Sequence, residues 1–240
     1  PDNSSETKTV VYFHGGGWVL NFLDIYDASL TRLANKSGAT IISVNYQKAP
    51  EHPFPIPFDD CYATLLWVIE NARNLNIDPA TIGVAGDSAG ANLASAVAIK
   101  ARDNNIALAF QLLIYPCNDR DFTTDSYLNC ATGYGLSTQA MQWFWDQYLQ
   151  GDHHDDNPYA VPMKAKTFKD IAPAIIITAQ YDPLLSDSQK YGELLERDGV
   201  PVTYKEYAGM IHGFFSNLAV TPTAREAIDF AASEIKRLTQ

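Results

Sequence analysis

The chain has 240 residues, of which 46% are hydrophobic and 19% charged, and this balance excludes a disordered protein. That length suits one core, so we expect a single domain over residues 1–240. The formal net charge of −11, without any run of Lys or Arg, argues against nucleic acid as a partner. No apolar stretch approaches the roughly 18 residues that a membrane span needs, so we expect none.

The cysteines and the first residue bear on where the protein works and how it was made. Cys61, Cys117 and Cys130 show no CxxC spacing, which indicates reduced thiols rather than a disulfide framework or a zinc site. We therefore expect a cytoplasmic protein. Because the chain opens with Pro1 instead of Met and soon enters an apolar run, we also expect a processed or truncated product.

The predicted elements alternate along the chain. Six apolar runs predict buried strands, at residues 9–13, 40–46, 81–85, 108–115, 174–179 and 202–207. Helical spacing appears at 27–36, from 59 or 60 onward, at 90–103, from the end of the fifth strand to 197, and at 222–238. Four of the thirteen prolines lie in 50–58, which we expect to be loop. This order predicts an α/β fold with a mostly parallel sheet and helices on both faces.

Residues 117–169 interrupt that alternation. The segment is polar and rich in Asp at both ends, with an aromatic helix around residues 141–148. We expect it to be an insertion over the carboxyl edge of the sheet. Its Trp143 and Trp145 could line a substrate pocket or belong to the core, and the sequence favours neither.

The Gly-Asp-Ser-Ala-Gly string at 86–90 follows the third strand and opens an Ala-rich helix. A strand that turns directly into a helix strains the residue between them, which is tolerated only if its neighbours are small. Gly86, Ala89 and Gly90 give that room. The turn therefore predicts Ser88 as an exposed nucleophile and the Ala89 N–H as an oxyanion donor. The alternative is a glycine turn that only packs helix on sheet.

Three glycines follow the first strand. Consecutive glycines let backbone N–H groups approach a ligand, and the carboxyl end of a strand is where open α/β sheets bind one. Gly15, Gly16 and Gly17 are therefore predicted to form an oxyanion hole, and the spacing leaves open which two point inward. A phosphate loop would need Lys-Ser/Thr or GxGxxG, which the loop lacks.

Among five histidines, His212 lies after the last strand and before the last helix, where a loop can reach Ser88. His14 more plausibly holds the glycine loop in shape. His153 and His154 beside two aspartates suggest a metal, but a polar loop more often leaves such groups solvated, so we expect no metal. Asp182, directly after the fifth strand, is the predicted carboxylate that orients the imidazole.

Asp187 is the fallback for that carboxylate, although we expect it in the first turn of the next helix. Three further residues are candidates for contact with substrate. They are Trp18, Asp87 and Phe214. The order Ser, Asp, His along the chain is that of α/β-hydrolases.

These motifs resemble the hormone-sensitive-lipase-like family of carboxylesterases. The family's marks are HGGG, the GDSAG elbow, a Tyr-x-x-Ala-Pro-Glu-His-Pro-Phe-Pro stretch, an Asp-Pro-Leu turn and a His-Gly-Phe loop. Here they stand at 14–17, 86–90, 46–55, 182–184 and 212–214, so the resemblance covers essentially the whole chain.

The resemblance implies an α/β-hydrolase that cleaves short to medium acyl esters, with Ser88 as nucleophile, His212 as base and Asp182 as its orienter. It gives the oxyanion donors as the N–H groups of Gly16, Gly17 and Ala89. It implies a small-molecule ester as substrate, no cofactor, and frequently a homodimer. Relatives carry N-terminal strands and cap helices that this chain lacks, so we expect a sheet without that edge and a more open pocket.

Two other classes stay open on the sequence. An amidase or deacetylase would use the same triad. A small-molecule receptor would use the same scaffold without chemistry, as plant gibberellin receptors do, but those receptors lack the catalytic histidine whereas His212 is present here.

Overall fold

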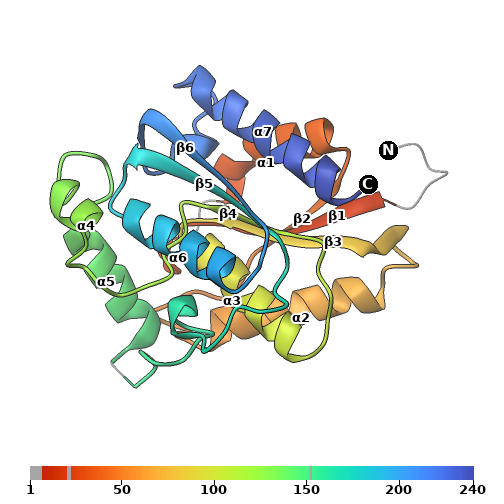
Figure 1. The fold of residues 1–240 in the computed structure, drawn as a ribbon, viewed down its shortest axis with the longest axis horizontal. Coiled ribbons are helices and arrows are strands. Elements are labelled where there is room, and N and C mark those ends of the chain that lie inside the picture. Colours follow the sequence, from red (N-terminus) through yellow and green to blue (C-terminus); the bar gives the residue numbers. More distant parts are fainter. Residues whose placement is uncertain (1–6, 21–22, 152) are drawn as a thin grey trace.

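The computed structural model describes residues 7–20, 23–151 and 153–240, and a six-stranded parallel sheet runs through its centre (Figure 1). The strand order is β2-β1-β3-β4-β5-β6 and every neighbouring pair is parallel. The strands are β1 (Thr7–Phe13), β2 (Thr40–Val44), β3 (Ile77–Asp87), β4 (Gln111–Ile114), β5 (Ala174–Tyr181) and β6 (Val202–Ile211). The expectation of an α/β fold with a parallel sheet is confirmed.

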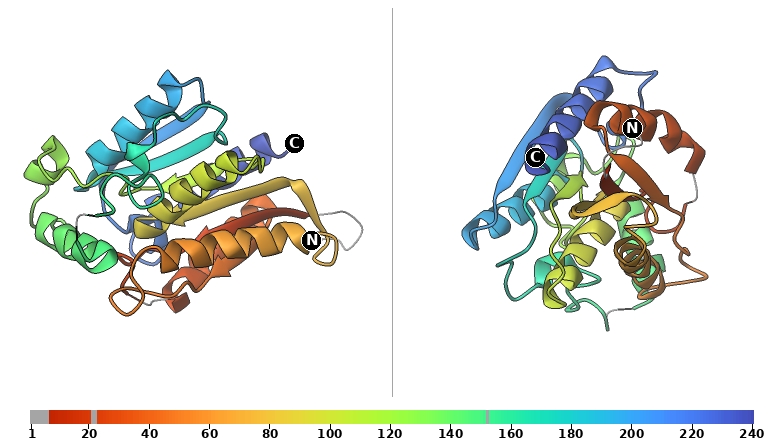
Figure 2. Two further views of the ribbon diagram at one scale, coloured as in Figure 1. Left: turned by 90° about the horizontal axis from the view of Figure 1, so that it is seen from below. Right: turned by 90° about the vertical axis from the view of Figure 1, so that its right-hand side faces the viewer.

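Helices cover both faces of the sheet. Helices α1 (Leu23–Ser37) and α7 (Pro222–Leu238) lie on one face, and α2 (Ile56–Glu70), α3 (Ala89–Asp103) and α6 (Leu185–Arg197) lie on the other (Figure 2). Alternate residues of β1 enter the two cores: Val10 and Tyr12 face α1 and α7, while Val11 and Phe13 face α2 and α3. Burial on both faces explains why the strand sequences are apolar throughout.

Several predicted boundaries are wrong. The proline-rich stretch was expected to be loop through residue 58, but α2 begins at Ile56 and carries Pro57 in its first turn. A proline is tolerated there because the first N–H groups of a helix have no partner within the helix. The second and fourth strands are also shorter than predicted, ending at Val44 and beginning at Gln111.

The segment between β4 and β5 forms α4 (Asp125–Asn129), α5 (Thr138–Leu149) and a short 3₁₀ helix, Pro162–Lys164. Helices α4 and α5 lie beyond the carboxyl ends of the strands (Figure 1). Trp145 is fully buried, whereas Trp143 on the same helix is 49% exposed, so the two tryptophans have different environments. Within the described residues, no helix is long and apolar enough to cross a membrane.

Candidate active site

Ser88 lies at the sharp turn between β3 and α3. Its backbone has φ 55° and ψ −124°, a strained conformation for a residue with a side chain. The turn is possible because its flanks are glycines. A Cβ on Gly86 would collide with the Gly90 carbonyl, and a Cβ on Gly90 would collide with the carbonyl oxygen of Phe13. The turn holds Ser88 at the carboxyl edge of the sheet, but the residue is buried, at 7% exposure, so the expectation of an exposed serine is wrong.

A hydrogen-bonded chain links Ser88 to His212 and Asp182. Ser88 Oγ lies 3.0 Å from His212 Nε2, and His212 Nδ1 lies 2.7 Å from Asp182 Oδ2. A carboxylate only accepts hydrogen bonds, so Nδ1 carries the proton and Nε2 is the acceptor that faces the serine hydroxyl. This tautomer is the one in which the imidazole can take a proton from Ser88.

Neighbouring strands bring the base and the carboxylate together. Asp182 directly follows β5 and His212 directly follows β6, and the preceding residues, Tyr181 and Ile211, are partners in the register of these strands. Asp182 is fully buried, and its Oδ1 accepts a 2.9 Å hydrogen bond from the Leu184 N–H. The carboxylate is therefore held in place before it meets the imidazole.

Asp187, the alternative carboxylate, lies in the first turn of α6, as predicted. It is buried, and burial together with the nearby charge of Asp119 raises its pKa well above the usual range. The hydrogen bond to His212 Nδ1 belongs to Asp182 instead.

The glycine loop after β1 departs from the prediction at its first residue. The Gly15 N–H donates to Asp87 Oδ1 at 2.9 Å and lies 3.1 Å from the Tyr26 hydroxyl, so it is not free to bind an oxyanion. In the part of the chain that the structure describes, the N–H groups of Gly16, Gly17 and Ala89 have no hydrogen-bond acceptor. Gly15 is therefore wrong as a donor.

Asp87 also differs from its expected role in substrate binding. It is 4% exposed, and its oxygens accept hydrogen bonds from Tyr12, Tyr26 and Gly15, so it has no face left for a substrate. Burial raises its pKa, and the hydrogen bonds from the two tyrosines and Gly15 partly offset that rise.

Trp18 and Phe214 are core residues instead of pocket residues. Trp18 is fully buried and stacks on Tyr148 of α5, with ring centroids 4.4 Å apart and planes 2° apart. Phe214 is 2% exposed and packs beside Tyr115 and Tyr207. Both predictions of substrate contact are wrong, because each ring is enclosed by other aromatic side chains.

His14 shapes the glycine loop, as the sequence suggested. Its Nδ1–H donates to the Gly15 carbonyl at 2.7 Å, and its ring stacks on Tyr46 at 4.6 Å. Burial lowers the pKa of His14 to about 4, so it is neutral at pH 7. Within the described residues, no three His, Cys, Asp or Glu side chains are arranged to hold a metal ion.

Some residues at this site were missed by the sequence reasoning. Tyr12, Tyr26 and Tyr46 all bond to the glycine loop or to Asp87. Phe144 of α5 stands where a side chain on Gly17 would have to go. Tyr46 belongs to one of the family motifs and Phe144 to the predicted aromatic helix, and both were usable signals, whereas nothing local marks Tyr26.

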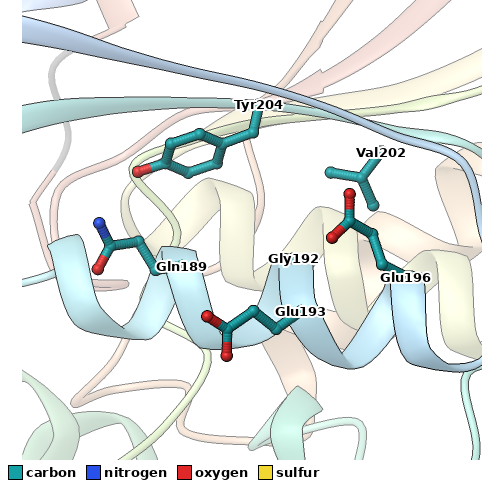
Figure 3. A pocket seen from close by; sticks show the side chains of 6 residues that line it. All are labelled: Gln189, Gly192, Glu193, Glu196, Val202 and Tyr204. Carbon is teal, nitrogen blue, oxygen red and sulfur yellow. The ribbon is translucent and has the colours of Figure 1, made fainter.

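A surface groove elsewhere on the molecule lies between α6 and β6 (Figure 3). Its lining holds no serine, cysteine or histidine that could act as nucleophile or base. The residues are Gln189, Gly192, Glu193, Glu196, Val202 and Tyr204. This groove therefore offers no group for nucleophilic catalysis.

Comparisons with known proteins agree with this fold. A family model described as the alpha/beta hydrolase fold matches residues 10–216. Esterase LipI of Mycobacterium tuberculosis is 39% identical over 95% of this chain and 71% of its own length. Carboxylesterase NlhH of the same organism is 39% identical over 95% of this chain and 73% of its own length.

Solved structures give the same result. A hyperthermophilic esterase from Pyrobaculum calidifontis superimposes with a TM-score of 0.94 at 39% identity, over 98% of this chain and 76% of the esterase. On these matches and on its motifs, the chain belongs to the hormone-sensitive-lipase-like family of the α/β-hydrolase fold.

Proposed function

We propose that this chain is a carboxylic ester hydrolase that acts on short to medium acyl esters through an acyl-enzyme intermediate. Ser88 is the nucleophile, His212 the general base and Asp182 the group that orients it. The observation that carries the proposal is the continuous contact from Ser88 Oγ to His212 Nε2 at 3.0 Å and from Nδ1 to Asp182 at 2.7 Å.

The first half of the reaction transfers the acyl group to the enzyme. Ser88 Oγ attacks the ester carbonyl carbon while its proton passes to His212 Nε2, and the carbonyl electron pair moves onto oxygen. The tetrahedral oxyanion then collapses and the bond to the alcohol oxygen breaks. The imidazolium returns its proton to that oxygen, so an alcohol leaves and acyl-Ser88 remains.

The second half releases the acid. A water molecule gives one proton to His212 Nε2 as its oxygen adds to the acyl carbon. Collapse of this second oxyanion breaks the bond to Ser88 Oγ, which takes the proton back from the imidazolium. A carboxylic acid leaves and the enzyme returns to its starting form. Throughout, the buried Asp182 stabilises the positive imidazolium.

Both oxyanions need hydrogen-bond donors that are already in place. The N–H groups of Gly16, Gly17 and Ala89 suit this role, because they have no acceptor within the described residues and two of them lie on a loop without side chains. The Ala89 N–H also lies at the first turn of α3, where the helix dipole favours negative charge. One such donor typically lowers the barrier by about 3–4 kcal/mol.

Relatives support this choice of reaction. LipI and NlhH are named as an esterase and a carboxylesterase, and the Pyrobaculum calidifontis protein is titled an esterase. The preference for short to medium acyl chains comes from the family resemblance. An amidase with the same triad or a receptor on the same scaffold has no specific observation in its favour.

The decisive experiment compares the wild type with Ser88→Ala. We expect the wild type to hydrolyse p-nitrophenyl acetate and to be labelled by a fluorophosphonate, and Ser88→Ala to lose both, with turnover reduced by about 10⁶-fold. Ser233→Ala, a matched change on the exposed face of α7, should leave both unchanged. Faster cleavage of a matched anilide would favour the amidase, and binding without turnover or labelling would favour the receptor.

Three further proposals accompany the reaction. Residues 1–240 form one catalytic domain in which 117–169 is an insertion over the site.

The enzyme works in the cytoplasm, consistent with three buried unpaired cysteines. It forms a homodimer, and light scattering of the purified chain would test this by its mass relative to 26.5 kDa.

A further inference from the structure

The peptide unit between His14 and Gly15 is bound at both ends by side chains from distant elements. Its N–H donates to Asp87 Oδ1 at 2.9 Å and lies 3.1 Å from the Tyr26 hydroxyl. Its C=O accepts a 2.7 Å hydrogen bond from the Tyr46 hydroxyl. A planar peptide held at both its N–H and its C=O has little freedom to rotate. The start of the glycine loop is therefore fixed in orientation.

The next two peptide units are also held, each by a hydrogen bond to its carbonyl oxygen. The Gly15 carbonyl accepts from His14 Nδ1, and the Gly16 carbonyl accepts from the N–H groups of Val19 and Leu20. In a trans peptide the N–H points opposite to the C=O. Each tethered carbonyl thus turns the N–H of the following residue, Gly16 or Gly17, to the other side of the loop.

Asp87 is the centre of this arrangement. Tyr12 donates to its Oδ1 at 2.8 Å and Tyr26 donates to its Oδ2 at 3.0 Å, in addition to the bond from Gly15. The three side chains are between 1% and 6% exposed. Taking a carboxylate out of water is costly unless its hydrogen bonds are replaced, and here three donors replace them.

Asp87 also immediately precedes Ser88. One residue therefore joins the segment that carries the nucleophile to the loop that carries the oxyanion donors. We propose that Asp87, with Tyr26, is a positioning residue that fixes the Gly16 and Gly17 N–H groups relative to Ser88. This inference rests on the proposed esterase function, and it adds a reason for an aspartate before the nucleophile.

The test is a series of near-isosteric variants: Asp87→Asn, Tyr26→Phe and Tyr12→Phe. Gly15 and Tyr12 donate to one oxygen of Asp87 and Tyr26 donates to the other. An asparagine keeps one acceptor oxygen and places an NH2 group at the other position, so at least one of these donors loses its acceptor and the loop loses part of its support. We expect Asp87→Asn to lower kcat about 100-fold with KM within about 2-fold of the wild type. Tyr26→Phe should lower kcat about 10-fold, and Tyr12→Phe less, because Tyr12 touches Asp87 but not the loop.

A second readout separates positioning from general damage. An aryl trifluoromethyl ketone adds to Ser88 and forms a tetrahedral oxyanion, whereas the matching methyl ketone binds as a ground-state analogue. In Asp87→Asn the inhibition constant of the trifluoromethyl ketone should rise by the same factor as kcat falls, with the methyl ketone unchanged. Active sites are counted by fluorophosphonate titration, so that misfolded protein does not contribute. Tyr191→Phe, an equally buried tyrosine on α6 beside Phe168, is the matched control and should behave as wild type.

Two outcomes would overturn the proposal. One is wild-type kcat per titrated site in Asp87→Asn, and the other is equal weakening of both ketones with a rise in KM. If Asp87→Asn does not fold, Tyr26→Phe decides alone, since it removes a single hydroxyl. Failure of the esterase proposal would look different, because the wild type itself would then show neither turnover nor labelling.

Discussion

Gly90, at the start of α3, lies against the carbonyl oxygen of Phe13, at the end of β1, so closely that a methyl group on Gly90 would overlap that oxygen. We therefore expect Gly90→Ala to destabilise the protein by about 3 kcal/mol and to abolish ester hydrolysis, because the helix must move away from the sheet. Urea denaturation measures the first effect and turnover of p-nitrophenyl acetate the second.

Gly192 on α6 gives the matched control for that variant. It is also helical, but a Cβ there would meet side-chain tips alone: that of Ile176 at 3.3 Å and that of Val202 at 3.8 Å. Because Ile176 can shift and alanine favours the helix by about 1 kcal/mol over glycine, Gly192→Ala should change the free energy of unfolding by less than about 1 kcal/mol. Equal effects of the two substitutions would contradict the steric explanation.

Asp182 and Asp187 differ by five positions and should differ greatly in their effect on catalysis. Asp182→Asn should lower kcat by about 10⁴-fold, because the amide would favour the wrong tautomer of His212. Asp187→Asn should leave kcat within a few-fold, since the hydrogen bond to His212 comes from Asp182. Steady-state kinetics on the two variants checks this, and a larger loss in Asp187→Asn would exchange their roles.

His14 should make the stability depend on pH. Its pKa is about 4 in the folded protein, whereas an unfolded histidine titrates near about 6.5. Between these values the unfolded chain binds more protons, so the free energy of unfolding falls as the pH decreases from about 6.5 to about 4. The loss approaches about 3 kcal/mol at the lower end.

Comparison with His14→Gln isolates that contribution, because all other groups titrate in both proteins. The difference in the free energy of unfolding between wild type and variant should shrink across this range, as followed by urea denaturation at steps of pH. A difference that stays constant from pH 7 to pH 4 would show that His14 does not resist protonation.

Trp18 and Trp143 test whether the aromatic residues near the site serve packing or substrate binding. Trp18→Ala should destabilise the protein by about 3–5 kcal/mol, because it removes a fully buried ring stacked on Tyr148. Trp143→Ala, at a position 49% exposed, should change stability by less than about 0.5 kcal/mol. Thermal unfolding of the two variants gives the comparison directly.

The fold could be predicted from the sequence because its signals are local. Apolar runs mark the six strands. The glycines around Ser88 are a second local signal, because a strand that turns directly into a helix leaves no room for side chains at these positions. Parallel strands then bring Ser88, Asp182 and His212 to the same edge of the sheet, and the structure has all three in hydrogen-bond contact. The start of α2 was misjudged, since a proline can stand in the first turn of a helix, and the bounds of the second and fourth strands were also predicted wrongly.

The direction of individual groups could not be predicted in the same way. Whether the Gly15 N–H points into or away from the site depends on Asp87 and Tyr26, which lie far from it along the chain. Trp18 was predicted to contact substrate, but Tyr148 of α5, far from it along the chain, stacks on its ring. In each case the deciding partner comes from tertiary structure, and no spacing in the sequence records it.

The register between β1 and β3 has a consequence for how this enzyme can change. Phe13 of β1 pairs with Gly86 of β3. The glycine loop follows Phe13 and the turn that carries Ser88 follows Gly86, so both segments leave the sheet within two residues of this pair. Sliding either strand by one residue would displace its loop by about 3.3 Å and exchange the two faces of the strand. The relative position of the two loops thus depends on the pairing of β1 with β3, two interior strands of the sheet. The segment between β4 and β5 takes no part in that pairing, so a change in its length would leave the register of β1 and β3 intact.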